Sequence, residues 1–253
     1  MSMYSRILFA FTILLRLIFI FLILISLFFA QLSYAELKKI DSSGKYSQFP
    51  GITVISKVNK DNHKMWDEIE QKLSQDQLIT KYFSLLPAKS YHMTTINLFT
   101  KRNHGGQNGK DWNSFIKLKK PLLKNLKIYL EKNAFEPHLK RVELLKTRVT
   151  SVISLKVPLE YAQMEKIQMT AAHFSLESKI PKPFHITLAY AYKKIPKKIY
   201  LKIIENINKI LNPILYTYRD KSVTFEVPKI NYFLDMTAYN EWNESIDKIE
   251  PQN

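Results

Sequence analysis

After residue 50 the hydrophobic pattern alternates between two periods. Apolar residues at every second position predict strands, and apolar residues at intervals of three and four predict helices. The predicted strands are 51–58, 90–99, 144–157 and 184–192, followed by one or two strands within 222–239. The predicted helices lie between them, within 59–86, 112–133, 159–174 and 195–215. The chain therefore predicts an α+β fold.

The two halves of this pattern resemble each other. Each half contains a strand, a helix and then a strand that carries a histidine two positions before a threonine, in "SYHMTTINLF" and "PFHITLAY". We interpret this as a weak internal duplication, visible in the pattern more than in residue identity. It predicts two similar lobes, each with an antiparallel sheet and helices, that face each other across a cleft.

The N-terminus has a different character from the rest of the chain. Arg6 and Arg16 precede an apolar run, Leu17–Ala30, in which Ser26 is the one polar residue, and Ser33 and Ala35 occupy the small-residue positions of a cleavage site. This pattern predicts a secretory signal peptide over residues 1–35. The alternative is a retained membrane anchor, although Arg16 near its middle would cost about 2.5–3.5 kcal/mol on insertion. Either interpretation places the folded part outside the cytoplasm, secreted or periplasmic in the first case.

The remaining boundaries follow from composition. Residues 36–50 are polar and mixed, which predicts a linker, and residues 246–253 predict a tail. The segment between them, 51–245, is the predicted domain. Its length is sufficient to bury a substantial core.

Charge and cysteine content narrow the chemistry. The formal net charge is +16, and because residues 1–35 contribute two arginines and no acid, the remainder carries +14. A basic surface favours polyanions such as RNA, phosphorylated small molecules or an anionic membrane surface. There is no cysteine, which excludes disulfides, thiolate nucleophiles and cysteine-ligated zinc. No grouping of His, Asp and Glu has metal-ligand spacing, and nothing in the sequence calls for a cofactor.

The two His-x-Thr motifs are the strongest functional signal. Residues two apart on a strand point to the same face, so His92 lies beside Thr94, and His185 beside Thr187. Two imidazoles that face one point can act as general base and general acid near neutral pH. The threonine hydroxyls can donate to phosphoryl oxygens, where negative charge gathers in the transition state. A single copy of the motif would indicate no more than a core histidine; two matched copies predict a catalytic site.

The motifs "YHMTTINLF" and "FHITLAYAY" resemble the paired H-x-T/S motifs of the 2H phosphoesterase superfamily. Within it, the chain is most similar to the uncharacterised bacterial DUF1868 family, through "GITVISKVN", "HMTTIN", "FHITLAY" and "INYFLDMTAYNEW". The resemblance implies a bilobal α+β fold and a metal-independent active site between the lobes. It also implies action on a 2′,3′-cyclic or 2′–5′-linked phosphate of a nucleotide or RNA end. It assigns catalysis to His92 and His185 and phosphate binding to Thr94 and Thr187.

Further residues near the motifs are candidate substrate contacts: Asn97, Arg102, His104 and Arg148. Tyr190 is out of phase with His185 and Thr187, so we expect it to pack in the core. Two other classes of function remain open. One is a nucleotide- or RNA-binding module without turnover, and the other is a membrane-surface interaction protein that uses the lysine-rich face.

Overall fold

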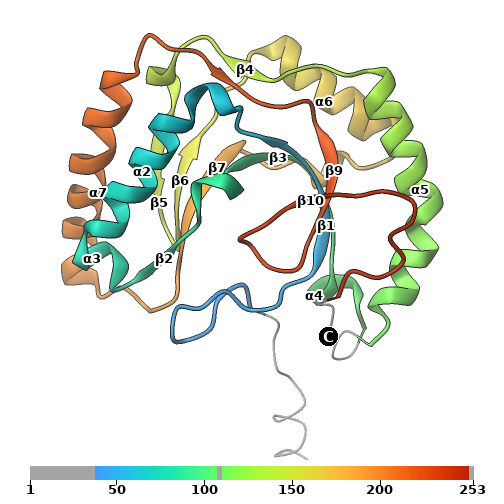
Figure 1. The fold of residues 1–253 in the computed structure, drawn as a ribbon, viewed down its shortest axis with the longest axis horizontal. Helices are drawn as coiled ribbons and strands as arrows, with labels where there is room; N and C mark the ends of the chain where they lie inside the picture. Colours follow the sequence, from blue (N-terminus) through green and yellow to red (C-terminus); the bar gives the residue numbers. More distant parts are fainter. Residues whose placement is uncertain (1–37, 107–109, 251–253) are drawn as a thin grey trace, which may run out of the picture. The chain divides into compact units, whose positions relative to one another are not determined.

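One large antiparallel sheet forms the centre of the molecule (Figure 1). Its strands follow the order β10-β9-β1-β3-β7-β6-β5, and β2 pairs with one end of β7. Their bounds are β1 Gly51–Lys57, β2 Phe83–Leu85, β3 His92–Thr100, β5 Lys146–Val149, β6 Val152–Lys156, β7 His185–Ala191, β9 Lys229–Phe233 and β10 Asn240–Glu241. A separate two-stranded ribbon pairs β4 His138–Leu139 with β8 Val223–Thr224.

This computed structural model describes residues 38–106 and 110–250. The predicted signal segment, residues 1–35, lies outside that range. Within the described residues, no helix combines the length and the apolar character that crossing a bilayer requires. Residues from Leu37 onward form a compact unit of their own.

The helices pack against the sheet through apolar stripes. Their bounds are α2 His63–Gln75, α3 Gln77–Thr80, α4 Lys101–His104, α5 Trp112–Lys132, α6 Tyr161–His173 and α7 Lys197–Thr217. Short 3-10 turns are η1 Lys60–Asn62, η2 Ala88–Ser90, η4 Val142–Leu144 and η5 Glu177–Lys179. In α7, for example, Ile203, Ile207, Leu211 and Ile214 recur at helical spacing and are all buried. This spacing places the four side chains on one side of the helix, where they join the core.

The two halves of the sequence interleave in space. Helix α2 from the first half packs against α7 from the second, while α6 contacts strand β3 of the first half. Tyr129 of α5 stacks on His173 of α6, with ring centroids 4.5 Å apart. Figure 1 shows these two groups, α2 with α3 and α7, and α5 with α6, on different sides of the sheet strands. The predicted α+β class with antiparallel strands is confirmed; the described strands other than β4 and β8 join in one sheet.

Two local predictions need revision. The single strand expected over 144–157 is a hairpin, in which Thr150 N–H donates to the carbonyl of Val152 over 2.9 Å. Strand β2 was not expected, because three residues are too few to show a period. The helix predicted within 112–133 is present as α5, with Pro121 inside it.

The segments predicted as linker and tail both contact the fold. Ile40 bridges to Tyr46, and Phe49 is 5% exposed. At the other end Ile249 is fully buried, and its carbonyl accepts a hydrogen bond from Trp112 Nε1 over 3.3 Å. These contacts place Lys39, which precedes the first bridge, next to the sheet.

Candidate active site

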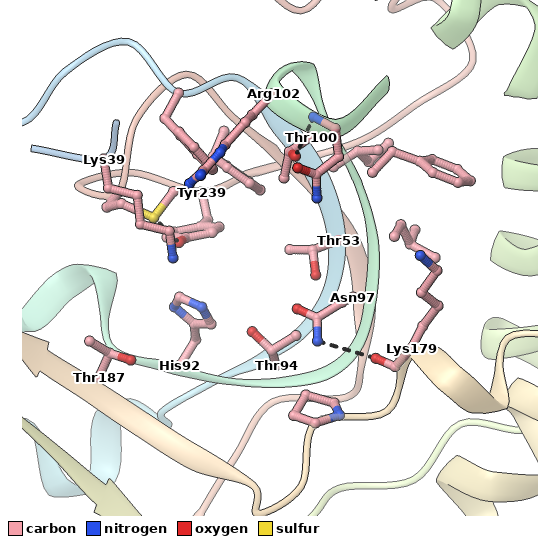
Figure 2. A pocket seen from close by; sticks show the side chains of 18 of the residues that line it. Lys39, Thr53, His92, Thr94, Asn97, Thr100, Arg102, Lys179, Thr187 and Tyr239 are labelled. Carbon is pink, nitrogen blue, oxygen red and sulfur yellow. Dashed lines mark hydrogen bonds between the residues drawn. The ribbon is translucent and has the colours of Figure 1, made fainter. Parts of the chain in front are cut away.

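The two motif strands are neighbours in the sheet. Strands β3 and β7 are antiparallel and meet at the pair Met93–Ile186. Met93 and Ile186 are the middle residues of the two His-x-Thr motifs. Since neighbouring residues of a strand point to opposite faces, the histidine and threonine of each motif lie on the other face of the sheet. The structure thereby brings together His92, Thr94, His185 and Thr187 in the lining of one pocket of about 370 Å³. Figure 2 shows three of them, His92, Thr94 and Thr187.

Both imidazoles are held by the same local contact. Nδ1 of His92 lies 2.7 Å from the carbonyl oxygen of Ser90, and Nδ1 of His185 lies 3.0 Å from that of Pro183. A carbonyl only accepts, so Nδ1 carries the proton in each ring and donates it. This tautomer leaves Nε2 as the nitrogen available to a ligand in the pocket. The two histidines, on neighbouring strands, thus make the same kind of backbone contact and line the same pocket.

The environment of His92 favours its neutral form. Burial of the ring is the main cause that lowers the pKa of His92, to about 4. The hydrogen bond to the Ser90 carbonyl has the opposite effect and raises this pKa. The positive charges of Lys39, His185 and Lys57 lower the pKa further. The ring also packs against Tyr239, with centroids 4.1 Å apart. A neutral imidazole with a free Nε2 lone pair can accept a proton at neutral pH.

A one-residue irregularity in β3 brings Asn97 to the same face. Between the pairs Val54–Ile96 and Ile55–Thr94, residue Thr95 has no partner in β1. Such an extra residue shifts the alternation by one position from that point on. Asn97, which strict alternation would place opposite His92, therefore lines the pocket with Thr94. Its Nδ2 donates to the carbonyl of Lys179 over 3.2 Å.

An extra residue of the same kind in β7 corrects our expectation that Tyr190 packs in the core. Thr187 pairs with Ser154 and Ala189 with Ile153, so Leu188 is the extra residue. Tyr190 then shares the face of Thr187 and lines the pocket, where strict alternation had assigned it to the core. Tyr91, which precedes the first motif, is 1% exposed and does pack in the core, edge-on to Trp66.

Lys39 is a pocket residue that sequence reasoning missed. Its Nζ donates to the Tyr190 hydroxyl over 3.1 Å and lies 4.7 Å from the centroid of that ring. Figure 2 shows the ammonium group on the His92 side of the pocket, near Tyr239. No pattern marked this lysine, because it lies in a polar segment that was predicted as a linker.

The pocket lining carries positive charge and no carboxylate. Lys39, Arg102 and Lys179 contribute cationic side chains, and the described residues of the lining include neither Asp nor Glu. Among residues 38–106 and 110–250 no cluster of His, Asp and Glu is suited to hold a metal ion. The arrangement suits an anionic ligand held by hydroxyls, imidazoles and ammonium groups.

The candidate substrate contacts separate into two groups. Asn97, Arg102 and His104 all line the pocket, beyond Thr94 along β3 and into α4. His104 stacks on Phe115 with centroids 4.9 Å apart, and burial lowers its pKa. Arg148 is exposed on β5 and is not among the lining residues, so the structure does not bring it to the motifs.

The fold is thus α+β with an antiparallel sheet, and two strands of that sheet carry His-x-Thr motifs that line one pocket. Residues 39–157 match the family model described as "2H-phosphodiest: Domain of unknown function (DUF1868)". The resemblance drawn from the motifs is therefore confirmed over residues 39–157, which match the model of this family. The match begins at Lys39 and contains the first motif, and it ends before the second.

Similar proteins are found in a virus and in bacteria. "Uncharacterized protein 127L" of Invertebrate iridescent virus 6 is 25% identical over 225 residues, which cover 77% of this chain and 93% of the viral protein. The fold is similar to the crystal structure of ATU0111, a conserved protein of unknown function from Agrobacterium tumefaciens str. C58. That match has a TM-score of 0.56 and 15% identity, and it covers 81% of this chain and 89% of that one. A weaker likeness, with a TM-score of 0.38 and 10% identity over 77% and 98% of the two chains, is to Kluyveromyces marxianus Usb1 with uridine monophosphate.

Proposed function

We propose that this protein is a metal-independent phosphodiesterase that opens a 2′,3′-cyclic or related phosphodiester of a nucleotide or RNA end. One observation carries the proposal. Two imidazoles, each with Nδ1 bonded to a carbonyl and Nε2 left for a ligand, line a basic pocket together with two threonines. The match of residues 39–157 to the family model supports the same class of reaction.

The low pKa of His92 supports one assignment of the roles that the sequence left open. His92 is neutral at neutral pH and acts as the general base: Nε2 takes a proton from water as the water oxygen attacks phosphorus. The bond from phosphorus to one ribose oxygen breaks, and His185, which enters this step with both ring nitrogens protonated, gives its Nε2 proton to that oxygen. His92 then releases a proton to solvent and His185 takes one up, which restores the starting state. Acid–base help of this kind contributes about 10²–10⁴-fold to the rate.

The remaining pocket groups hold the phosphate. Thr94 and Thr187 donate hydrogen bonds to the non-bridging oxygens, whose negative charge increases in the transition state. Lys39 neutralises part of that charge from the same side as His92. In this proposal the two interleaved halves of the chain act as two lobes, and each lobe supplies one motif to a cleft. The pairing of β3 with β7 forms the floor of that cleft.

The proposed location follows from the N-terminal sequence. A signal peptide over residues 1–35 would place the enzyme outside the cytoplasm, secreted or periplasmic. Its basic surface would be attracted to an anionic membrane surface. Extracellular nucleotides or RNA fragments would then be its substrates.

The test uses the compact unit from Leu37 to Asn253 with EDTA present. The protein is mixed with the four 2′,3′-cyclic nucleotides and with a short RNA that ends in a cyclic phosphate, and products are separated by chromatography. We expect turnover that is lost in His92→Ala and in His185→Ala. The exposed His138 provides a matched control, because its Nδ1 makes the same kind of contact to the carbonyl of Glu136.

Retained activity in either motif variant would reject the two-histidine mechanism. Binding of nucleotides without any turnover would identify the protein as a binding module instead. The product isomer, a 2′- or a 3′-phosphate, reports which ribose oxygen His185 protonates.

A further inference from the structure

The pocket beyond Thr94 contains a pair of polar residues that the reaction derived above does not use. Thr53 of β1 and Asn97 of β3 lie directly opposite each other in the antiparallel register. Both line the pocket, and Figure 2 shows them next to each other and near Thr94. Opposite side chains on one face of an antiparallel pair have Cβ atoms about 4.5–5.5 Å apart. The two side chains can therefore bind one group of a ligand together.

The contact of Asn97 with the neighbouring wall determines which of its polar atoms faces the pocket. Its Nδ2 donates to the backbone carbonyl of Lys179 over 3.2 Å. Since a carbonyl oxygen only accepts, the amide nitrogen must face Lys179 and the amide oxygen takes the other position. Figure 2 shows that oxygen on the side of Thr94, away from Lys179. Asn97 therefore presents a hydrogen-bond acceptor to the pocket.

Thr53 presents an acceptor as well. Its Oγ1 donates to the backbone carbonyl of Ile96 over 3.0 Å, and this bond uses the one proton of the hydroxyl. The lone pairs of Oγ1 remain, and Figure 2 shows this oxygen turned toward Asn97. Thr53 is only 7% exposed, so bulk water has little access to it. The two residues together are complementary to a group that carries two hydrogen-bond donors.

The surroundings favour a neutral donor group on a flat, mainly apolar body. Apolar residues of the same pocket lining are Ile52, Leu98, Phe99, Pro181 and Phe233. The lining also has cationic side chains and, among its described residues, no carboxylate, which disfavours a positively charged amine. The amino group of adenine or cytosine is uncharged and has two N–H donors, one for each acceptor. Uracil and hypoxanthine have a carbonyl oxygen at the same ring position, and that oxygen would face two acceptors.

We propose that Thr53 and Asn97 form a base-recognition site that selects adenine and cytosine over uracil and hypoxanthine. Three strand positions separate Thr94 from Asn97, which is at most about 10 Å, and a nucleoside bridges such a span from its ribose phosphate to the edge of its base. The proposal rests on the proposed function, because the phosphate of the same nucleotide reacts between His92 and His185. It narrows the substrate class to adenosine and cytidine nucleotides, or RNA ends that carry these nucleosides.

Binding of product-type ligands tests the base preference without any turnover. Cytidine is compared with uridine, and adenosine with inosine, each as mixed 2′- and 3′-monophosphates, with affinities measured by calorimetry. The proteins are the unaltered unit Leu37–Asn253, Asn97→Leu, Thr53→Val and, as a matched control, Asn133→Leu. Asn133 is exposed and outside the pocket lining, and its Nδ2 also donates to a backbone carbonyl, that of Tyr129, over 2.9 Å.

We expect the nucleotide with the amino group to bind about tenfold more tightly in each pair, because the carbonyl of its counterpart leaves both acceptors unpaired. This ratio should fall to about twofold in Asn97→Leu, which removes one acceptor. It should fall similarly in Thr53→Val, which removes the other acceptor and keeps the shape of the side chain. In Asn133→Leu the ratio should stay unchanged.

The outcomes that overturn the inference differ in what else they overturn. If the two nucleotides of each pair bind equally, or the uridine and inosine nucleotides bind more tightly, the base site is rejected while the proposed function stands. The same conclusion follows if the preference survives undiminished in Asn97→Leu or in Thr53→Val. If none of the four nucleotides binds, both the base site and the proposed nucleotide substrate are rejected.

Discussion

The low pKa of His92 has a measurable effect on stability. An ordinary histidine has a pKa of 6.5, and burial lowers that of His92 to about 4 in the folded chain. Between these values the unfolded chain binds a proton at this position and the folded chain does not. Stability that is present above pH 6.5 is therefore lost as the pH falls toward 4.

The size of the effect follows from the difference in pKa. Each unit corresponds to about 1.4 kcal/mol, so the full difference would be about 3 kcal/mol. The ring is half-buried and partly reached by water, which reduces the expected loss to about 2 kcal/mol. This is a substantial share of the roughly 5–15 kcal/mol that stabilises a typical domain.

His92→Asn removes the titrating group and keeps an amide donor near the Ser90 carbonyl. We expect the free energy of unfolding of the unaltered protein to fall more steeply than that of the variant between pH 7.5 and 4.5. The difference between the two should shift by about 2 kcal/mol in favour of the variant. Urea unfolding at several pH values measures it, and His138→Asn controls for loss of an exposed imidazole with a similar carbonyl contact.

Parallel stability curves for the unaltered protein and His92→Asn would refute the reasoning. They would mean that His92 has the same pKa in the folded and unfolded chains and is not kept neutral by burial. The assignment of His92 as general base would then lose its support. If the reasoning holds, the acid limb of kcat/KM also lies near pH 4 instead of near 6.5.

Two further changes test the walls of the pocket. Lys39→Gln should lower kcat/KM by about 10–100-fold, because it removes charge next to the reacting phosphate, and Lys39→Arg should stay partly active. As a control, Lys38→Gln at the exposed neighbouring position should have no effect on kcat/KM. Equal losses at Lys38 and Lys39 would contradict a direct role of Lys39. Gly51→Ala would place a Cβ 2.3 Å from Phe233 Cζ, in a buried ring that lines the pocket, and should destabilise the fold by about 1–3 kcal/mol in urea unfolding. An unchanged unfolding midpoint would show that the Phe233 ring moves aside without cost.

The sequence predicted those features that depend on local periodicity. The helical spacing that defines α7 and the alternation at the start of β3 and β7 each follow from the residues themselves. The face shared by His92 and Thr94 needs nothing beyond the two-residue period of a strand. The pairing of β3 with β7 could not be derived in this way, since it joins segments about 90 residues apart through tertiary packing.

Irregularities within strands set the limit of this reasoning. The extra residues Thr95 and Leu188 have ordinary strand character, and nothing in the hydrophobic pattern distinguishes them from their neighbours. Each nevertheless reverses the alternation that follows. Proximity to the first motif made Asn97 a candidate contact, although strict alternation placed it on the other face; the same strict alternation assigned Tyr190 to the core.

Lys39 shows most clearly why a site can extend beyond the domain that the sequence outlines. Its segment contains few apolar residues, so its pattern is that of a linker, yet Ile40 and Phe49 are both buried. Phe49 N–H donates to the Leu234 carbonyl over 2.7 Å, which fixes the segment beside the loop that carries Met236 and Tyr239. Because those loop residues also line the pocket, the chain ahead of β1 and the chain after β9 together form its wall above His92. The family match begins at Lys39 as well. A fragment that began at Gly51 would keep both motifs and lose the cation beside them, so we infer that the functional unit begins before the first strand.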